Sequence, residues 1–257
     1  MLSGTANSVD ANTPLVIDET VLAGYEFESI AGPGCPAALG DTITLNPGDD
    51  VTCEITNNDI PANLTLVKTI INDDGGLIVD PNAFALTIDG APVLSGIPNS
   101  VSANTALAIN ETVLAGYTFE SISGLGCPAV LGGAITLNPG DDVVCTIVND
   151  DIPATLTLVK TIINDDGGLT TDPDAFALTI DGAPALSGTP NTVPANTPLA
   201  IDETVLAGYE FESIAGPGCP AALGGAITLD PGADVVCTIV NNDICLLYTS
   251  PSPRDRG

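Results

Sequence analysis

The sequence predicts an all-β protein that consists of tandem antiparallel β-sandwich modules. Short apolar stretches rich in Thr, Val and Ile alternate with clusters of Gly, Pro, Asn and Asp, which is the pattern of strands separated by turns. No segment keeps a helical hydrophobic period. Most of the chain also matches itself at an offset of 92 residues, which indicates an array of similar modules.

The internal match divides the chain into three repeats. The motif ETVLAGY occurs at 19–25, 111–117 and 203–209, whereas TLVKTIINDDGGL occurs only at 65–77 and 157–169. We therefore expect complete repeats at 62–152 and 154–244, preceded at 1–61 by a truncated repeat that lacks its first strands. Each complete repeat is long enough to bury a core of its own. Because Met1 stands in the middle of a repeat, we expect the natural protein to extend further toward its N-terminus.

The middle repeat illustrates the elements that we expect in each module. Turn residues, such as NDDGG at 72–76, Asp89-Gly90 and NPGDD at 138–142, separate the candidate strands. The predicted strands are 64–71, 83–88, 93–95, 99–102, 106–111, 117–122, 134–137 and 143–149. Seven or so short strands in one repeat predict a sandwich of immunoglobulin-like or prealbumin-like type.

The last thirteen residues, 245–257, differ from the rest in composition. They read CLLYTSPSPRDRG and hold both arginines and the seventh cysteine. This stretch is similar to the conceptual translation of a sequencing-library adapter. We interpret it as a cloning or assembly scar that packs against no module.

Composition excludes several classes of function. The formal net charge is −29, so nucleic acid and anionic membranes are electrostatically rejected. No apolar run approaches the roughly 20 residues that a membrane-spanning helix needs. There is no histidine, nucleophile motif or phosphate-binding loop. We therefore expect a non-enzyme, whose only catalysis would be an autocatalytic reaction within the chain.

The six cysteines of the repeats form three pairs, and the members of each pair lie 18 positions apart. One pair per module predicts a disulfide in each module and hence an oxidising, extracellular or cell-surface location. Metal binding by these cysteines is disfavoured, because there is no histidine and no C-x-x-C spacing. The predicted disulfides are Cys35–Cys53, Cys127–Cys145 and Cys219–Cys237.

The chain has only two lysines, Lys68 and Lys160, and each lies in the same strand-like run, LTLVKTI. Strand side chains alternate between faces, so each lysine points where the leucines of its strand point. A glutamate and an asparagine of each complete repeat are in apolar phase as well. The resulting sets are Lys68, Glu111 and Asn149, and Lys160, Glu203 and Asn241.

Three explanations account for an inward-facing lysine. Burial favours the neutral amine and the protonated acid, and this pair facing an Asn carboxamide is arranged for amide formation with loss of ammonia. The product would be an isopeptide bond between the first and last strands of the module. Alternatively, the three residues form a noncovalent hydrogen-bonded cluster. In the third explanation, the lysine is an edge-strand residue that opposes aggregation, with its amine in solvent.

Each complete repeat has a lysine in its first strand, an E-T-x-x-x-G-Y element and a last strand that ends in Asn. In these features it resembles the SpaA-like or collagen-adhesin B-type prealbumin-fold modules of bacterial surface stalks and pili. The resemblance implies that Lys68 and Lys160 form isopeptide bonds with Asn149 and Asn241. It also implies that Glu111 and Glu203 assist the reaction. The truncated repeat has the equivalent Glu19 and Asn57 but no lysine strand, so no bond is expected there.

The acidic turns suggest a second kind of site. Clustered carboxylates, as in INDDGG at 71–76 and NPGDDV at 138–143, are ligands for hard cations such as calcium. Neither turn has the spacing of an EF-hand loop, and Asp, Asn and Gly are also ordinary turn formers. We therefore expect no cofactor, and calcium remains the alternative.

The sequence thus predicts a structural stalk or spacer repeat of a secreted or surface-displayed bacterial adhesin-like protein. The near-identity of the copies favours a spacer, because a dedicated binding site would need only one copy. The alternative is a ligand-binding adhesion module, with or without calcium. The expected partners are neighbouring repeats of the same chain and a surface or matrix ligand that the sequence does not identify.

Overall fold

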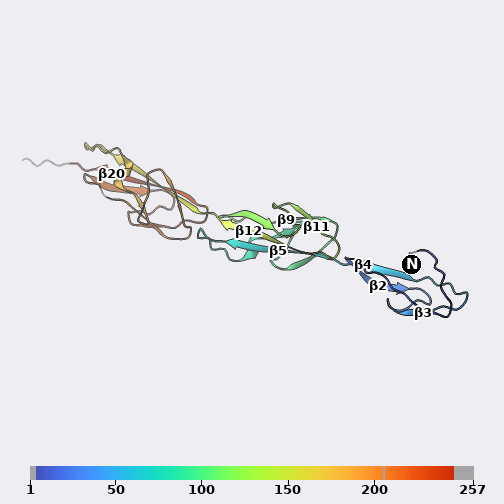
Figure 1. The fold of residues 1–257 in the computed structure, drawn as a ribbon. Coiled ribbons are helices and arrows are strands. Elements are labelled where there is room, and N and C mark those ends of the chain that lie inside the picture. Colours follow the sequence, from blue (N-terminus) through green and yellow to red (C-terminus); the bar gives the residue numbers. More distant parts are fainter. Residues whose placement is uncertain (1–3, 205, 246–257) are drawn as a thin grey trace, which may run out of the picture. The chain divides into compact units, whose positions relative to one another are not determined.

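The computed structural model describes residues 4–204 and 206–245. These residues form strands, turns and two short 3₁₀ helices, and the predicted all-β sandwich class is confirmed (Figure 1). None of the helices in the described part is long and apolar enough to cross a membrane. The boundary between two compact units passes through the middle repeat, so each repeat is described by itself. The adapter-like residues 246–257 lie outside the described part.

The third repeat is a sandwich of two four-stranded sheets, with strand orders β16-β13-β20-β18 and β15-β14-β17-β19. The strands are β13 (Ala154–Ile163), β14 (Thr179–Ile180), β15 (Ala183–Pro184), β16 (Pro190–Val193), β17 (Leu199–Asp202), β18 (Tyr209–Ala215), β19 (Ala226–Ile227) and β20 (Asp234–Asp243). Neighbouring strands in the described part of these sheets pair antiparallel, except that β13 and β20 are parallel.

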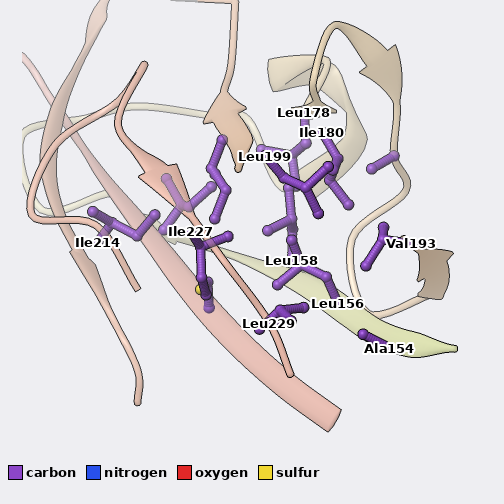
Figure 2. Close-up of a cluster of buried hydrophobic side chains, with 14 of the residues drawn as sticks. Ala154, Leu156, Leu158, Leu178, Ile180, Val193, Leu199, Ile214, Ile227 and Leu229 are labelled. Carbon is purple, nitrogen blue, oxygen red and sulfur yellow. The ribbon is translucent and has the colours of Figure 1, made fainter. Parts of the chain in front are cut away.

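The core of the third repeat lies between its two sheets. Ala154, Leu156 and Leu158, which alternate along β13, are fully buried. They pack with Ile201 of the facing sheet and Ile239 of β20, and Figure 2 shows side chains from both sides of the sandwich converging on this space. Because Lys160 follows Leu158 in the same alternation, the packing that buries the leucines also directs the lysine inward.

The middle repeat has the same two sheets, with orders β10-β12-β5-β8 and β11-β9-β6-β7. Figure 1 shows β5 and β12 side by side in it. Its strands are β5 (Ala62–Ile71), β6 (Thr87–Ile88), β7 (Ala91–Pro92), β8 (Pro98–Val101), β9 (Ala106–Asn110), β10 (Tyr117–Ser123), β11 (Ala134–Thr136) and β12 (Asp142–Asp151).

Two of the predicted strands of the middle repeat are wrong in part. The predicted strand 83–88 is split into a 3₁₀ helix η1 (Pro81–Phe84) and the short β6, and Ala85 between them has a φ of 43°. Proline starts such a helix readily, and a left-handed residue cannot continue a strand. The predicted strand 93–95 is replaced by β7, which ends at Pro92. Phe84, at the end of this helical turn, is fully buried.

The same helical turn recurs in the third repeat as η2 (Pro173–Phe176). The side chain of Asp172 caps it by accepting a hydrogen bond from the backbone N–H of Asp174 (3.0 Å). Ala177 ends it in the left-handed region, with a φ of 43°. The turn places Phe176 in the core beside the lysine strand.

The first repeat contains two separate pairs of strands. They are β1 (Pro14–Val16) with β3 (Thr42–Thr44) and β2 (Tyr25–Ala31) with β4 (Glu54–Asp59), both antiparallel. These pairs correspond to β9 with β11 and to β10 with β12 of the middle repeat. Pro36 is the one residue that is buried among 4–61.

All three predicted disulfides are present. The Cα–Cα distances are 5.7 Å for Cys35–Cys53, 5.8 Å for Cys127–Cys145 and 5.8 Å for Cys219–Cys237. In the two complete repeats the bridge ties a Gly-rich loop to the last strand, and in the first repeat Cys53 lies directly before β4. Cys245, which lies after the third repeat, is free and exposed.

We predict that replacing Cys219 and Cys237 together by alanine lowers the free energy of unfolding of the third module by about 3 kcal/mol. A bridge across 18 positions removes about this much conformational entropy from the unfolded chain. Calorimetry of the full chain measures the shift of that module's thermal transition. Cys245→Ala is the matched control and leaves the transition in place, whereas equal shifts in both variants would contradict the prediction.

Candidate functional site: a buried lysine between the first and last strands

Lys160 of the third repeat lies in a buried cluster of polar groups. The residue is 7% exposed, and its side chain is inaccessible to solvent. Its amine donates hydrogen bonds to Oδ1 of Asn241 and to Oε2 of Glu203. The amine also lies 4.3 Å from the centre of the Phe176 ring. The three polar residues of the predicted set are therefore in direct contact in this repeat.

The strand pairing explains why these residues meet. In the parallel pairing of β13 with β20, Lys160 lies opposite Ile239, and Asn241 is two positions further along on the same face. Glu203 enters from the facing sheet, directly after β17. The side chain of Asp202 accepts the backbone N–H of Glu203 (2.9 Å) and so fixes the chain where the strand ends.

Electrostatics shift the Lys160 amine toward its neutral form. Burial lowers the pKa of Lys160 below its ordinary value, and the hydrogen bond and charge of Glu203 partly oppose this effect. Transfer of one proton from the amine to Glu203 would leave two neutral groups in contact. A neutral amine has the free electron pair that attack on a carboxamide requires.

Two buried polar atoms of the cluster have no hydrogen-bond partner. They are Oε1 of Glu203 and Nδ2 of Asn241, and both residues contact the same amine. An unpartnered buried polar group is costly and calls for an explanation. In an amide exchange, Nδ2 would be the leaving nitrogen and the glutamate its proton donor, so the arrangement is suited to that reaction.

The middle repeat has the same lysine–asparagine contact. The amine of Lys68 donates to Oδ1 of Asn149 and lies 4.3 Å from the centre of the Phe84 ring. Glu111 is also buried, with 9% exposure. Because both lysines are buried, with 6% and 7% exposure, their burial favours the reactive or hydrogen-bonded explanation over an edge-strand role.

In the first repeat the equivalent residues meet without a lysine. Nδ2 of Asn57 donates to Oε2 of Glu19 over 3.0 Å, and Asn57 is exposed. The glutamate and the asparagine therefore come together even where the first strand is missing.

Comparison with protein families identifies the fold of the complete repeats. The profile of the SpaA-type prealbumin-like fold domain matches residues 59–147 and 151–239, which is more than half of the chain. The chain belongs to this family. A comparison with curated proteins finds no match.

Several solved structures of pilus proteins, two major pilins and one pilus adhesin among them, are similar to this chain. The major pilin of Streptococcus pyogenes has 11% identity and a TM-score of 0.29, over 72% of this chain and 98% of the pilin. Another major pilin of that species, T-13, has 10% identity and a TM-score of 0.29, over 87% and 100%. The pilus adhesin SpaC of Lactobacillus rhamnosus GG has 12% identity and a TM-score of 0.29, over 92% and 44%.

Sequence reasoning missed an aspartate that pins the loop after each lysine strand. Asp243 accepts the backbone N–H groups of Asp165 (3.0 Å), Asp166 (3.0 Å) and Gly168 (2.5 Å). Asp151 binds the N–H groups of Asp74 and Gly76 in the same way in the middle prealbumin-like module. Both aspartates follow the buried asparagine by two positions. Continuing the strand alternation by one step would have found them.

A tyrosine completes the support of the same loop. Tyr209 donates its hydroxyl hydrogen to Oδ1 of Asn164 (2.6 Å) and accepts the backbone N–H of Thr170 (3.0 Å). Its ring meets Phe176 edge-on, with centroids 5.4 Å apart. The tyrosine of the E-T-x-x-x-G-Y element thus joins the loop to the aromatic ring beside the lysine.

The acidic turns have structural partners of their own. Asp73, Asp150 and Asp151 lie close enough together to share a cation, as do Asp165, Asp166 and Asp243. The buried aspartate of each group already accepts backbone N–H groups of the loop. In the turn at 138–142, Asp141 accepts the backbone and side-chain N–H groups of Asn138. Closure of the loops and turns therefore accounts for Asp151, Asp243 and Asp141.

We predict that Asp243→Asn destabilises the third module at neutral pH but not in strong acid. Desolvation raises the pKa of Asp243, but the hydrogen bonds from Gly168, Asp166 and Asp165 outweigh it, so the pKa lies below its ordinary value. The charged carboxylate of Asp243 therefore adds stability to the folded module at pH values above the pKa of Asp in the unfolded chain, about 3.9. This stability is lost as the pH falls through the lower folded-state pKa.

Thermal unfolding of wild type and variant between pH 2 and pH 7 tests this dependence. The difference in melting temperature should be full at pH 7 and shrink toward zero in acid. Asp234→Asn, on the exposed face of the same strand, serves as the control and should leave the melting temperature nearly unchanged. A difference that is constant across the pH range would argue against a role for the charge.

Proposed function

We propose that the chain is a structural spacer of a secreted or surface-displayed bacterial protein, in which each complete module is clamped by an intramolecular isopeptide bond. The bonds join Lys68 to Asn149 and Lys160 to Asn241. The observation that carries the proposal is the contact of a buried lysine in the first strand with an asparagine in the last strand. The same contact occurs in both complete modules.

The cluster of the third module contains every group that the reaction needs. Nζ of Lys160, as a neutral amine, attacks Cγ of Asn241 and forms the new C–N bond. The bond from Cγ to Nδ2 breaks, and Nδ2 leaves as ammonia. Glu203 takes a proton from the amine and returns one to the leaving nitrogen, so it ends in its starting state. Amine and carboxamide become one amide and one ammonia, without an oxidant or cofactor.

The position of the bond suits a protein under tension. Because β13 and β20 run parallel, the chain enters the module at one end of this strand pair and leaves at the other. Tension would pass from the first strand through the bond to the last strand. The residues between Lys160 and Asn241, which are 81 positions apart, would be shielded from it. A spacer held at both ends needs this property.

The disulfides and the surface charge support a location outside the cytoplasm. Disulfides persist in oxidising compartments, and a strongly acidic surface opposes aggregation and binding to nucleic acid. The competing function, a ligand-binding adhesion module, would require an accessible site. The polar cluster that recurs in both complete modules is buried, and this favours the spacer.

We predict that the chain, with its three disulfides reduced for the measurement, is lighter than its sequence mass by two ammonia molecules, one from each complete module. Intact-mass spectrometry measures this deficit directly. Glu203→Ala should restore one ammonia by removing the proton carrier of the third module. Glu210→Ala, at an exposed position of β18, is the matched control and should keep the full deficit. An unmodified mass in folded protein would leave only the noncovalent cluster.

We also predict that the bond makes each module inextensible. Under reducing conditions, pulling on the Glu203→Ala variant should release about 80 further residues, or about 280 Å of chain at about 3.5 Å per residue. Single-molecule force spectroscopy measures this extra length. The wild-type module and the Glu210→Ala control should show no such step, and a full-length step in wild type would refute the clamp.

A further inference from the structure

The connection between the middle and the third module is too short to be a flexible linker. β12 ends at Asp151 and β13 begins at Ala154, so only Ile152 and Pro153 lie between them. The ring of Pro153 fixes its own φ and also narrows the conformations that Ile152 can adopt. Little freedom therefore remains in the covalent connection itself.

The backbone of Ile152 is hydrogen-bonded to both modules. Its N–H donates to the carbonyl oxygen of Gly116 in the middle module (2.9 Å), and its own carbonyl accepts the N–H of Gly232 in the third module (2.7 Å). A Cβ atom at Gly116, whose φ is 81°, would lie 2.8 Å from the carbonyl oxygen of Pro231. The turns at Gly116 and at 231–232 therefore pack directly on each other, and only glycine fits between them.

The same arrangement joins the first repeat to the middle one. The N–H of Ile60 donates to the carbonyl oxygen of Gly24 (2.8 Å), and the carbonyl of Ile60 accepts the N–H of Gly140 (2.8 Å). A Cβ atom at Gly24 would lie 2.4 Å from the carbonyl oxygen of Pro139. Because the pattern recurs with the repeat, it belongs to the way in which successive modules are connected.

The middle and third modules have a second contact, made by the loop 72–76 that follows the lysine strand. The carbonyl oxygen of Asp74 accepts the N–H of Ala195 (2.8 Å), and that of Gly75 accepts Nδ2 of Asn196 (2.8 Å). A Cβ atom at Gly75, whose φ is 95°, would lie 2.3 Å from the carbonyl oxygen of Ala195. Ala195 is 1% exposed, so the contact excludes water.

The loop 72–76 is held in place by its own module. Asp151 accepts the N–H groups of Asp74 (3.2 Å) and Gly76 (2.5 Å). The hydroxyl of Tyr117 donates to the side chain of Asn72 (2.6 Å). The peptide groups of the loop thus direct their N–H side to the last strand of the middle module and offer their carbonyl oxygens to the third module. A loop fixed in this way is a preformed acceptor surface.

We propose that the loop 72–76 and the turn at Gly116 form a docking surface for the following module, and that this junction joins the middle and third modules as one rigid body. All residues of the junction belong to one of the two compact units. The partner that fits is a prealbumin-like module with turns like those at 195–196 and 231–232. Bending the spacer here would require the hydrogen bonds from Gly232, Ala195 and Asn196 to break together.

Residual dipolar couplings of the backbone amides, measured in the weakly aligned full chain, test the junction. One alignment tensor should fit the amides of both the middle and the third module, because a rigid pair orients as a single body. Separate tensors for the two modules of the wild-type chain would overturn the proposal.

Gly75→Ala should open the junction, because its new methyl group would collide with the backbone of Ala195. We expect separate tensors for the two modules in this variant. Gly167→Ala is the matched control: its φ of 96° imposes the same backbone strain, but a Cβ atom there meets nothing within 4 Å. This control should keep the single tensor. A single tensor in Gly75→Ala, or separate tensors in both variants, would argue against the docking surface.

Asn196→Asp changes the other side of the junction and keeps the fold. Aspartate tolerates the left-handed φ of 55° but cannot donate to the carbonyl of Gly75. Hydrogen exchange of the Ala195 amide, which is bonded across the junction, should become about tenfold faster. Asn104→Asp makes the same change at the equivalent turn of the middle module, which takes no part in this contact, and should leave that rate unchanged. Equal rates in both variants would contradict the assignment.

The junction and the isopeptide bonds can fail separately. A chain that keeps its full sequence mass but shows one alignment tensor would refute the bonds and support the junction. A chain that has lost two ammonia molecules but needs separate tensors would support the bonds and overturn the junction.

Discussion

The packing of each complete module depends on one costly contact, a lysine amine buried between the first and last strands. Removing an ammonium group from water costs several kcal/mol, and breaking a buried pair leaves its partner uncompensated. Lys160 is tolerated because Asn241 and Glu203 bind its amine and Phe176 covers it. The cluster therefore works as a set, which explains why a complete repeat carries all of its members. Loss of any one would leave a desolvated polar group.

One face of the last strand carries four residues that stabilise the third module. Cys237, Ile239, Asn241 and Asp243 alternate along β20 and are all buried. In order, they hold the disulfide, fill the core, bind the lysine and cap the loop that follows the lysine strand. Because side chains at every second position share a face, a single strand aligns all four against β13. A shift of its register by one residue would disrupt every one of them.

Strand periodicity made much of the site predictable from sequence. The alternation along LTLVKTI predicted that Lys68 points inward, and the constant spacing of the cysteine pairs predicted the three disulfides. The helical turn Pro81–Phe84 was not predicted, because Phe84, Leu86 and Ile88 alternate as the residues of one strand would. All three are buried, but Phe84 ends a 3₁₀ helix and does not belong to the strand. The parallel contact of first and last strands spans most of a module in sequence. Local pattern cannot supply such a pairing, and only the family resemblance indicated it.

The order of events follows from the chemistry of the amine. In an unfolded chain the lysine is solvated, has an ordinary pKa near 10.4 and is protonated, so it cannot attack an amide. The pKa of Lys160 falls only when burial removes the amine from water. The proposed bond must therefore follow folding, and it cannot guide the first strand to the last. Its effect lies in opposing separation of strands that noncovalent packing has already brought together, which is a resistance to unfolding and to force.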